Sequence, residues 1–285
     1  MEPQIDATLV ERLVRSQHPR FSAPVDMLAH GWDNDIYRLG DEHLVRLPRR
    51  AVAADLIAGE QRWLPTIATL LPVPVPTPVA AGEPEFGYPF RWSITPWLPG
   101  APAFEWSIAT RGAVADQLAD ALLALHVAAP VDAPVNPVRG VPLARRDSAL
   151  RERLPAFDNA AQIESAWQRA LAAPPWGGTA VWLHGDLHPA NILLEQRTDG
   201  LELAAIIDFG DVTSGDPATD LAVAWLAFDA AGRWRFRERM APDDATWGRA
   251  RGWALNMATA MITGSPDGSP MIPIGQAALE QVLAD

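Results

Sequence analysis

The sequence predicts an α+β fold with two lobes, a small β-rich N-terminal lobe and a larger, mainly helical C-terminal lobe. Up to about residue 96, short apolar runs of strand length alternate with turn residues around one long helical pattern. Beyond residue 100, most apolar residues recur at helical spacing. The stiff segment Pro-Trp-Leu-Pro-Gly separates the two patterns. We therefore expect an N-terminal lobe at 1–96, a hinge at 97–100 and a C-terminal lobe at 101–285.

The composition is that of a globular protein with an acidic surface. The chain has 285 residues, a formal net charge of −12 and no cysteine. The charge argues against nucleic acid as a partner, because nucleic-acid binding needs a basic surface, but it permits attraction of a cationic small molecule. Without cysteine, disulfides and thiolate chemistry are excluded. The sequence shows neither a signal peptide nor an apolar run of about 18 residues, so we expect a cytoplasmic protein with no membrane partner.

In the N-terminal lobe, Asp6 is a candidate N-cap for a first helix. The next three apolar runs are expected to form strands, at 25–29, 36–39 and 44–47. The turn Gly40-Asp41-Glu42 joins the last two as a hairpin. A long helix at 52–71 should end before Pro72, because proline cannot continue it. An extended Pro-rich connector at 72–78 then leads to two more strands, at 78–81 and 90–95.

In the C-terminal lobe, two helix starts carry capping residues. Ser107 is a candidate N-cap for a helix to about residue 128. Asp216, followed by Pro217 at the first helical position, begins a helix to about residue 230. Residues 130–142 form a Pro-rich loop. Further helices are expected at 159–172, 243–262 and 275–284, and short strands at 180–183, 192–194 and 203–207.

Two short segments carry the chemistry of the chain. Residues 184–195 read His-Gly-Asp-Leu-His-Pro-Ala-Asn-Ile-Leu-Leu-Glu, and residues 206–211 read Ile-Ile-Asp-Phe-Gly-Asp. Phosphoryl transfer from a nucleotide needs a carboxylate to accept the proton of the attacking hydroxyl, and oxygen ligands to hold Mg²⁺ on the phosphates. Asp186 fits the first role, and Asn191 and Asp208 fit the second. A strand–turn–strand hairpin would bring Asn191 and Asp208 to the same end.

The first segment also permits a different reading. His184, Asp186 and His188 alternate, so on a strand they could bind Zn²⁺ or a di-metal centre of a metallohydrolase. Gly185 and Pro189 favour a loop instead. The metallohydrolase stays an alternative at this point.

The two segments resemble the catalytic loop and the metal-binding loop of the protein-kinase-like fold, in the form used by the aminoglycoside phosphotransferase family. The stretch Asp-Phe-Gly-Asp-x-x-x-Gly-Asp-Pro-x-x-Asp-Leu-Ala at 208–222 extends this resemblance. It implies a small-molecule kinase that uses Mg²⁺ and either ATP or GTP to phosphorylate a hydroxyl-bearing small molecule. It implies Asp186 as the catalytic base and Asn191 and Asp208 as the metal ligands. Support of the loops would fall to His184, His188, Asp211, Asp216 and Asp220.

The resemblance extends more loosely into the N-terminal lobe, where it implies nucleotide contacts. The turn from Gly31 to Asn34 would cover the phosphates. Arg46 on the third strand would bind the α- and β-phosphates, with Glu60 of the long helix as its partner. Backbone groups of the hinge, at Trp97 and Leu98, would bind the nucleotide base.

The resemblance leaves the acceptor open. An aminoglycoside-type antibiotic is one expectation, which would make the protein a resistance enzyme, and a cellular sugar or amino alcohol is another. A catalytically silent nucleotide-binding module is a third alternative, and the pattern predicts no oligomeric state. Acidic side chains of the C-terminal lobe are candidates for a cationic acceptor or are simply solvated, namely Glu105, Asp211, Asp229, Asp243 and Asp244.

Overall fold

The computed structural model describes residues 3–31 and 33–285. Met1, Glu2 and Trp32, the last in the turn expected to cover the phosphates, lie outside the described residues. The chain divides into two compact units, Met1–Leu98 with Asp208–Gly210, and Pro99–Ile207 with Asp211–Asp285. The first is a β-sheet unit and the second is mainly helical, which confirms the α+β, two-lobed fold class. Among helices within the described residues, none is long and apolar enough to cross a membrane.

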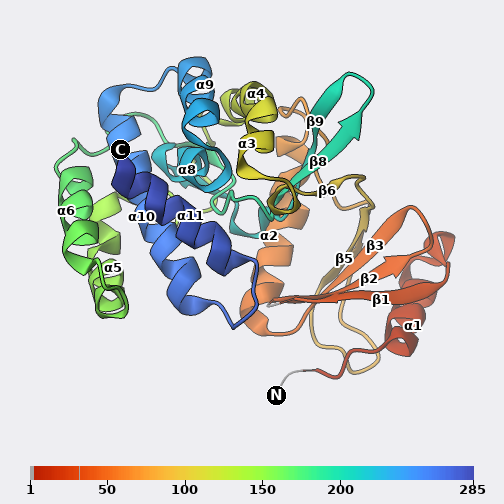
Figure 1. Ribbon diagram of the computed structural model, residues 1–285. Helices are drawn as coiled ribbons and strands as arrows, with labels where there is room; N and C mark the ends of the chain where they lie inside the picture. Colours follow the sequence, from red (N-terminus) through yellow and green to blue (C-terminus); the bar gives the residue numbers. More distant parts are fainter. Residues whose placement is uncertain (1–2, 32) are drawn as a thin grey trace. The chain divides into compact units, whose positions relative to one another are not determined.

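The N-terminal unit is built on a five-stranded antiparallel sheet in the order β1-β2-β3-β5-β4 (Figure 1). Gly40 makes the β2–β3 turn with φ 58°, a conformation that suits glycine. The connector before β4 has no regular structure, as expected from its prolines. The strands are β1 Val25–His30, β2 Asn34–Leu39, β3 His43–Pro48, β4 Ala80–Gly82 and β5 Trp92–Pro96.

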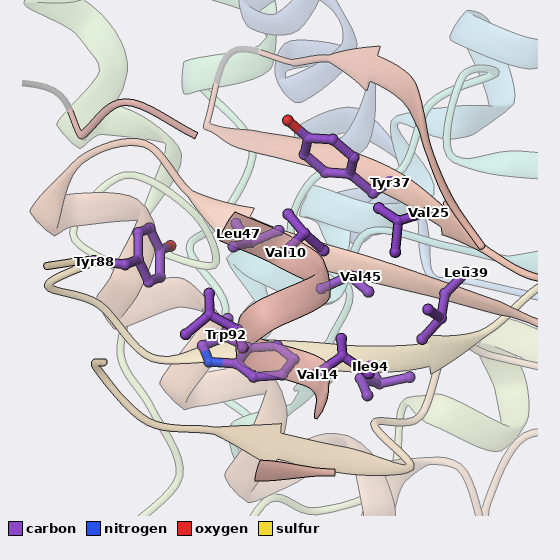
Figure 2. Packing of buried hydrophobic residues seen from close by; sticks show 11 residues of the cluster. Val10, Val14, Val25, Tyr37, Leu39, Val45, Leu47, Tyr88, Trp92 and Ile94 are labelled. Carbon is purple, nitrogen blue, oxygen red and sulfur yellow. The ribbon is translucent and has the colours of Figure 1, made fainter. Parts of the chain in front are cut away.

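The helix α1, Ala7–Gln17, covers one face of this sheet, and the buried side chains between the helix and the sheet form the core of the unit. The Asp6 side chain accepts a hydrogen bond from the Leu9 amide at 2.8 Å, which confirms the predicted N-cap. Figure 2 shows the packing of α1 residues against the strands, with Trp92 fully buried. The labelled members of this core are Val10, Val14, Val25, Tyr37, Leu39, Val45, Leu47, Tyr88, Trp92 and Ile94.

The helix α2, Ala51–Ile67, packs against β3 and β5. Side chains alternate along a strand, so Arg46 points away from the α1 face that Val45 and Leu47 occupy. Arg46 reaches Glu60 on the buried side of α2. The helix ends four residues earlier than predicted, in a turn where the Thr69 amide and hydroxyl both donate to the Thr66 carbonyl.

The C-terminal unit contains two small sheets and a set of helices (Figure 1). β6 Ala101–Pro102, β8 Ile192–Arg197 and β9 Gly200–Ile206 form one sheet, and β7 Val181–Leu183 pairs with β10 Thr213–Gly215 in the other. The long helices α10 and α11 pack along each other. The helices are α3 Ile108–Arg111, α4 Ala115–Leu125, α5 Asp147–Arg153, α6 Ala160–Leu171, α7 Ala218–Leu221, α8 Val223–Ala227, α9 Ala230–Met240, α10 Asp244–Gly264 and α11 Met271–Ala284.

The helix predicted from Ser107 to about residue 128 is wrong as a continuous element. Ser107 does cap α3, but a 3-10 turn, Gly112–Val114, separates α3 from α4. Gly112 packs closely against Gly232 of α9, and its carbonyl accepts a hydrogen bond from Arg235 of the same helix. The tertiary contact therefore interrupts a sequence whose local preference is helical.

The helix predicted from Asp216 to about residue 230 is also wrong as a continuous element. The chain forms α7 and α8 and then becomes extended at Phe228, with φ −120° and ψ 151°. Asp229 restarts it, because its carboxylate accepts from the Gly232 amide at 2.8 Å and caps α9. α5 and α9 were not predicted at all.

Candidate active site

The start of the loop that carries Asp186 is held by the buried carboxylate of Asp220. Asp220 accepts hydrogen bonds from the backbone amides of His184 at 2.8 Å and Gly185 at 2.9 Å. It also lies 3.2 Å from Nε2 of His126. Burial alone would raise the pKa of Asp220, but the hydrogen bonds from His126 and the Gly185 amide outweigh it and lower the pKa. Asp220 is thus an ionised anchor for the start of the loop.

Gly185 is required by the path of this loop. Its φ is 88°, and a Cβ atom there would lie 2.3 Å from the carbonyl oxygen of Asp211. Any side chain would both strain the backbone and collide with the neighbouring loop.

The two ring nitrogens of His184 are both engaged by the backbone. Nδ1 accepts from the Asp186 amide at 3.2 Å, and Nε2 donates to the Ile207 carbonyl at 2.9 Å. The residue is fully buried. A metal ligand needs a free ring nitrogen, so this arrangement does not support the metallohydrolase alternative. Residues 3–31 and 33–285 also contain no group of three or more histidine and carboxylate side chains placed to hold a metal ion.

Asp186 lies at the centre of a small charged network. Its Oδ1 accepts from Nη2 of Arg139 at 2.5 Å, and its Oδ2 lies 3.5 Å from Nε2 of His188. Burial by itself raises the pKa of Asp186, but Arg139 and then His188 outweigh burial and hold the pKa well below its usual range. The carboxylate is therefore ionised at neutral pH, and it is still 27% exposed.

Asn191 is held at the base of the β8–β9 hairpin. Its Nδ2 donates to the Asp186 carbonyl at 2.9 Å, and its own carbonyl accepts from the Ile207 amide at 2.9 Å. Because the Nδ2 atom bonds to the Asp186 carbonyl, the Oδ1 atom of Asn191 points away from that carbonyl and could serve as a hard oxygen ligand. The predicted hairpin is present, with Ile192 paired to Ile206.

Two further carboxylates of the second motif contact side chains from neighbouring segments. Asp211 accepts from Nδ2 of Asn136 at 2.8 Å and lies 3.9 Å from Nε of Arg139. Asp216 accepts from the Ala218 amide at 3.1 Å and forms a buried ion pair with Arg249, with Nε and Oδ2 at 2.7 Å.

The N-terminal unit contains a second charged cluster, made by Arg46, Glu60 and Asp208. Nη1 of Arg46 donates to Oε2 of Glu60 at 2.5 Å, and its Nη2 lies 3.6 Å from Oδ1 of Asp208. Burial alone would lower the pKa of Arg46, but the charges of Glu60 and Asp208 raise it, so Arg46 stays charged. Asp208 has φ 62°, an uncommon conformation for a non-glycine residue, and its side chain is 57% exposed.

Hydrogen bonds to backbone atoms form at Gly31, in the predicted phosphate-covering turn, and at Trp97, in the hinge. The Gly31 amide donates to the Asn34 carbonyl at 2.9 Å, and Arg49 donates to the Gly31 carbonyl at 3.0 Å. The Trp97 amide donates to the Glu42 carbonyl at 2.7 Å and extends the pairing of β5 with β3.

Comparison with models of protein families identifies the family of this chain. The model of the phosphotransferase enzyme family matches residues 26–253, which is most of the chain. The chain belongs to this family. Membership confirms the resemblance to aminoglycoside phosphotransferases and makes the protein a phosphotransferase. Among curated proteins no significant match was found.

Solved structures of similar fold include phosphotransferases of two kinds. APH(2")-IIia, in complex with GDP and kanamycin, aligns with a TM-score of 0.72 at 19% identity, covering 97% of this chain and 98% of that chain. The macrolide 2'-phosphotransferase MphH from Brachybacterium faecium aligns with a TM-score of 0.62 at 22% identity, covering 98% and 97%. APH(2")-IIa, in complex with streptomycin and ATP, aligns with a TM-score of 0.63 at 18% identity, covering 98% and 97%.

The structure also brings residues that the sequence did not single out against the motif. His126, Asn136, Arg139 and Arg249 each contact a motif carboxylate. All four lie outside the two motifs, in segments whose pairing to the motifs is a tertiary event. The sequence contained one usable signal, the Pro-rich loop at 130–142, because a fixed loop next to a motif can deliver a charged side chain.

Proposed function

We propose that this phosphotransferase transfers the γ-phosphoryl group of ATP or GTP to a hydroxyl group of a small molecule, with Mg²⁺ as cofactor. The observation that carries the proposal is the state of Asp186: an ionised, partly exposed carboxylate on a loop whose backbone is fixed by Asp220 and by Asn191. A catalytic base must be both ionised and held in place, because a misplaced group loses much of its effect.

In the proposed reaction, the acceptor oxygen attacks the γ-phosphorus and the bond from that phosphorus to the β–γ bridging oxygen breaks. The electron pair of the broken bond leaves with the nucleoside diphosphate. The hydroxyl proton passes to Asp186 as the new O–P bond forms. The low pKa of Asp186 makes it a weak base in the ground state, so it accepts the proton late, when the hydroxyl has become acidic. Such a role contributes a rate factor of roughly 10²–10⁴.

The residues proposed to hold Mg²⁺ are Asn191 and Asp208. Both offer oxygen, the donor that Mg²⁺ prefers, and Mg²⁺ is usually bound by one or two protein groups plus phosphates and water. The Asn191 amide nitrogen donates to the Asp186 carbonyl, so its side-chain oxygen is turned away from that carbonyl. The Asp208 carboxylate is more than half exposed. The ion would neutralise charge on the phosphates.

The N-terminal unit is proposed to bind the nucleotide. Arg46 would contact the phosphates while Glu60 holds it, and the turn from Gly31 to Asn34 would lie over them. The Trp97 amide is already bonded to the Glu42 carbonyl on the β3 side, which leaves the Leu98 amide and the Pro96 carbonyl as candidates. Those two groups are the hinge atoms we propose for the base.

The test is a nucleotide-consumption assay with ATP and with GTP over a panel of hydroxylated compounds. Kanamycin and streptomycin, which are bound in structures of similar fold, are the first acceptors to assay, and sugars and amino alcohols are the second. Asp186→Asn should lower kcat by roughly 10²–10⁴ with Mg-nucleotide affinity unchanged. Asp199→Asn, in an exposed turn, is the matched control and should behave as wild type.

Two outcomes would contradict the proposal. Near-normal turnover by Asp186→Asn would mean that Asp186 is not the base. Nucleotide binding by the wild type without turnover on any acceptor would favour the silent nucleotide-binding module. We place the enzyme in the cytoplasm in this proposal, where ATP and GTP are available.

A further inference from the structure

Arg139, Arg146 and Arg153 lie in one segment, which runs from residue 139, a contact of the proposed base, to the end of α5. Arg139 contacts Asp186, Arg146 ends the 3-10 helix Leu143–Arg146, and Arg153 ends α5. The pKa of Arg146 is lowered mainly by burial and, to a smaller extent, by repulsion from the charge of Arg139. Burial and the charges of Arg146 and Arg139 likewise lower the pKa of Arg153, against a smaller opposing effect of Glu152. The three guanidinium groups therefore share one electrostatic neighbourhood.

Two of these three charges have no acidic partner. Arg139 is neutralised by Asp186 and Asp211. Within residues 3–31 and 33–285, no carboxylate forms an ion pair with Arg146 or Arg153. The Nε atom of Arg146 is buried without a hydrogen-bond partner. A half-buried cation without a counterion is costly, and such a group is commonly matched by a bound anion.

The contacts of Arg153 explain its position but not its charge. Its Nη1 donates to the Asn256 carbonyl at 2.8 Å and to the Thr259 hydroxyl at 2.9 Å, which ties α5 to α10. Both acceptors are uncharged. The guanidinium is thus held rigidly, as a group that must receive a ligand should be.

Three of the candidate acidic residues for a cationic acceptor make other contacts, namely Asp229, Asp243 and Asp244. Asp229 caps α9, and Asp243 caps α10 by accepting from the Thr246 amide at 2.6 Å. Asp244 pairs with Arg237. The chain as a whole has a net charge of −12, yet Arg146 and Arg153, in the segment that follows Arg139, have no carboxylate partner among the described residues. Local charge decides which ligand enters a site, because solvent screens distant charges.

We propose that the acceptor is a hydroxyl compound that carries a carboxylate or phosphate group, and that Arg146 and Arg153 bind this anionic group while its hydroxyl reaches Asp186. The inference rests on the proposed function for the role of Asp186. It reverses the preference for a cationic acceptor that the overall charge and the kanamycin and streptomycin complexes of similar folds suggest. Arg146 and Arg153 become specificity-determining residues.

The first experiment measures turnover on acceptors that share one scaffold, namely glucose, glucosamine, glucuronate and glucose 6-phosphate. We expect kcat/KM for an anionic member to exceed that for glucose and glucosamine by about tenfold or more, the effect of one charge-assisted contact. The carboxylate and phosphate arms separate the two kinds of anion. Higher kcat/KM on glucosamine, or on kanamycin in the same assay, would overturn the inference and leave the phosphotransferase proposal intact.

The second experiment measures anion binding and needs no turnover. Malonate and inorganic phosphate are titrated into the full chain by calorimetry, with Arg146→Met and, as a matched control, Arg145→Met, the exposed neighbour. We expect Arg146→Met to weaken binding of the preferred anion about tenfold or more, and Arg145→Met to leave it unchanged. Circular dichroism checks that both variants are folded. Failure of the wild type to bind either anion at millimolar concentration, or equal binding by Arg146→Met, would refute the inference whether or not the enzyme is active.

Discussion

The two clusters of candidate functional residues, one in each unit, are held in place by different physical means. In the N-terminal unit, Arg46 is fixed by side-chain contacts with Glu60 and Asp208, across the face of a sheet. In the C-terminal unit, the loop before Asp186 is fixed by Asp220, which accepts hydrogen bonds from backbone amides. The first arrangement depends on two matched side chains. The second depends on one carboxylate and on the path of the backbone.

This difference explains why the sequence motif is dense in one half and sparse in the other. A loop built on backbone bonds needs residues that permit one path, such as Gly185 and Pro189, at fixed spacing from its anchor. A strand–helix ion pair needs only two positions that face each other, far apart in sequence. Breaking each anchor separately therefore tests whether the contrast is real.

The largest effect is expected from Asp220→Ala. It leaves two buried amides without an acceptor, at about 1–3 kcal/mol each, so the free energy of unfolding should fall by about 4 kcal/mol. Urea unfolding at pH 7 measures it, with Asp199→Ala as the control, which should change stability by less than about 0.5 kcal/mol. A small loss for Asp220→Ala would mean that water or other groups replace the anchor.

The next effect concerns the ion pair of the N-terminal unit. Arg46→Met removes the counterion of a buried carboxylate and should destabilise the fold by about 3 kcal/mol. The double variant Arg46→Met with Glu60→Met replaces both charges by apolar groups and should recover most of this loss. Neither variant should bind Mg-nucleotide normally.

The single and double variants separate the structural role of Arg46, as the partner of Glu60, from its proposed role in binding phosphates. Recovery of stability together with recovery of nucleotide affinity would show that Arg46 does not contact the phosphates. Calorimetry with Mg-ATP and Mg-GTP reads the affinity, and urea unfolding reads the stability. Asp55→Met, on an exposed side chain of the same helix α2, serves as a control for the change of charge.

The same contrast shows what could be predicted from sequence. The strands of the N-terminal sheet and α1 were predictable, because apolar runs bounded by turn residues and the Asp6 cap are local signals, whereas β6 and β10 were not predicted. The break at Gly112 was not, because the contact that causes it comes from α9, more than one hundred residues later. The cap at Asp229 was a local signal that lay inside a run of helix-favouring residues and was outweighed by them.

The motif residues could be named as candidates from the sequence, and the side chains that contact them could not. Asp186, Asn191 and Asp220 stand at recognisable spacing in two segments. Arg139 reaches Asp186 from a Pro-rich loop whose position depends on hydrogen bonds such as that from the Asn136 amide to the Thr213 hydroxyl. Pairing of that kind is set by the folded chain, and no local pattern encodes it.

A smaller effect, with a pH dependence, is expected for Arg139→Met. The folded-state pKa of Asp186 lies below the unfolded value of about 3.9, so the pair stabilises the fold above that pH and the contribution is lost as the pH falls through the folded pKa. Arg139→Met should cost about 1 kcal/mol at pH 7, since both side chains are partly exposed. The difference from wild type should shrink at pH 3. A difference that is equal at both pH values, or that Arg145→Met reproduces, would show that the loss is one of packing.

The smallest effect is expected at the hinge, where the ring of Trp97 lies 3.8 Å from the guanidinium carbon of Arg38. Trp97 is 39% exposed, so the cation–π contact should contribute about 0.5–1 kcal/mol. A double-mutant cycle with Trp97→Leu and Arg38→Met, followed by urea unfolding, isolates that coupling from other contacts of Arg38 with the Gly40 carbonyl. We propose that the hinge binds the base through backbone atoms, so Trp97→Leu should leave Mg-nucleotide affinity within about twofold of wild type, a difference of less than about 0.5 kcal/mol. A larger loss of affinity with little loss of stability would show that the indole itself contacts the base, and would make the hinge a side-chain site like the Arg46–Glu60 pair.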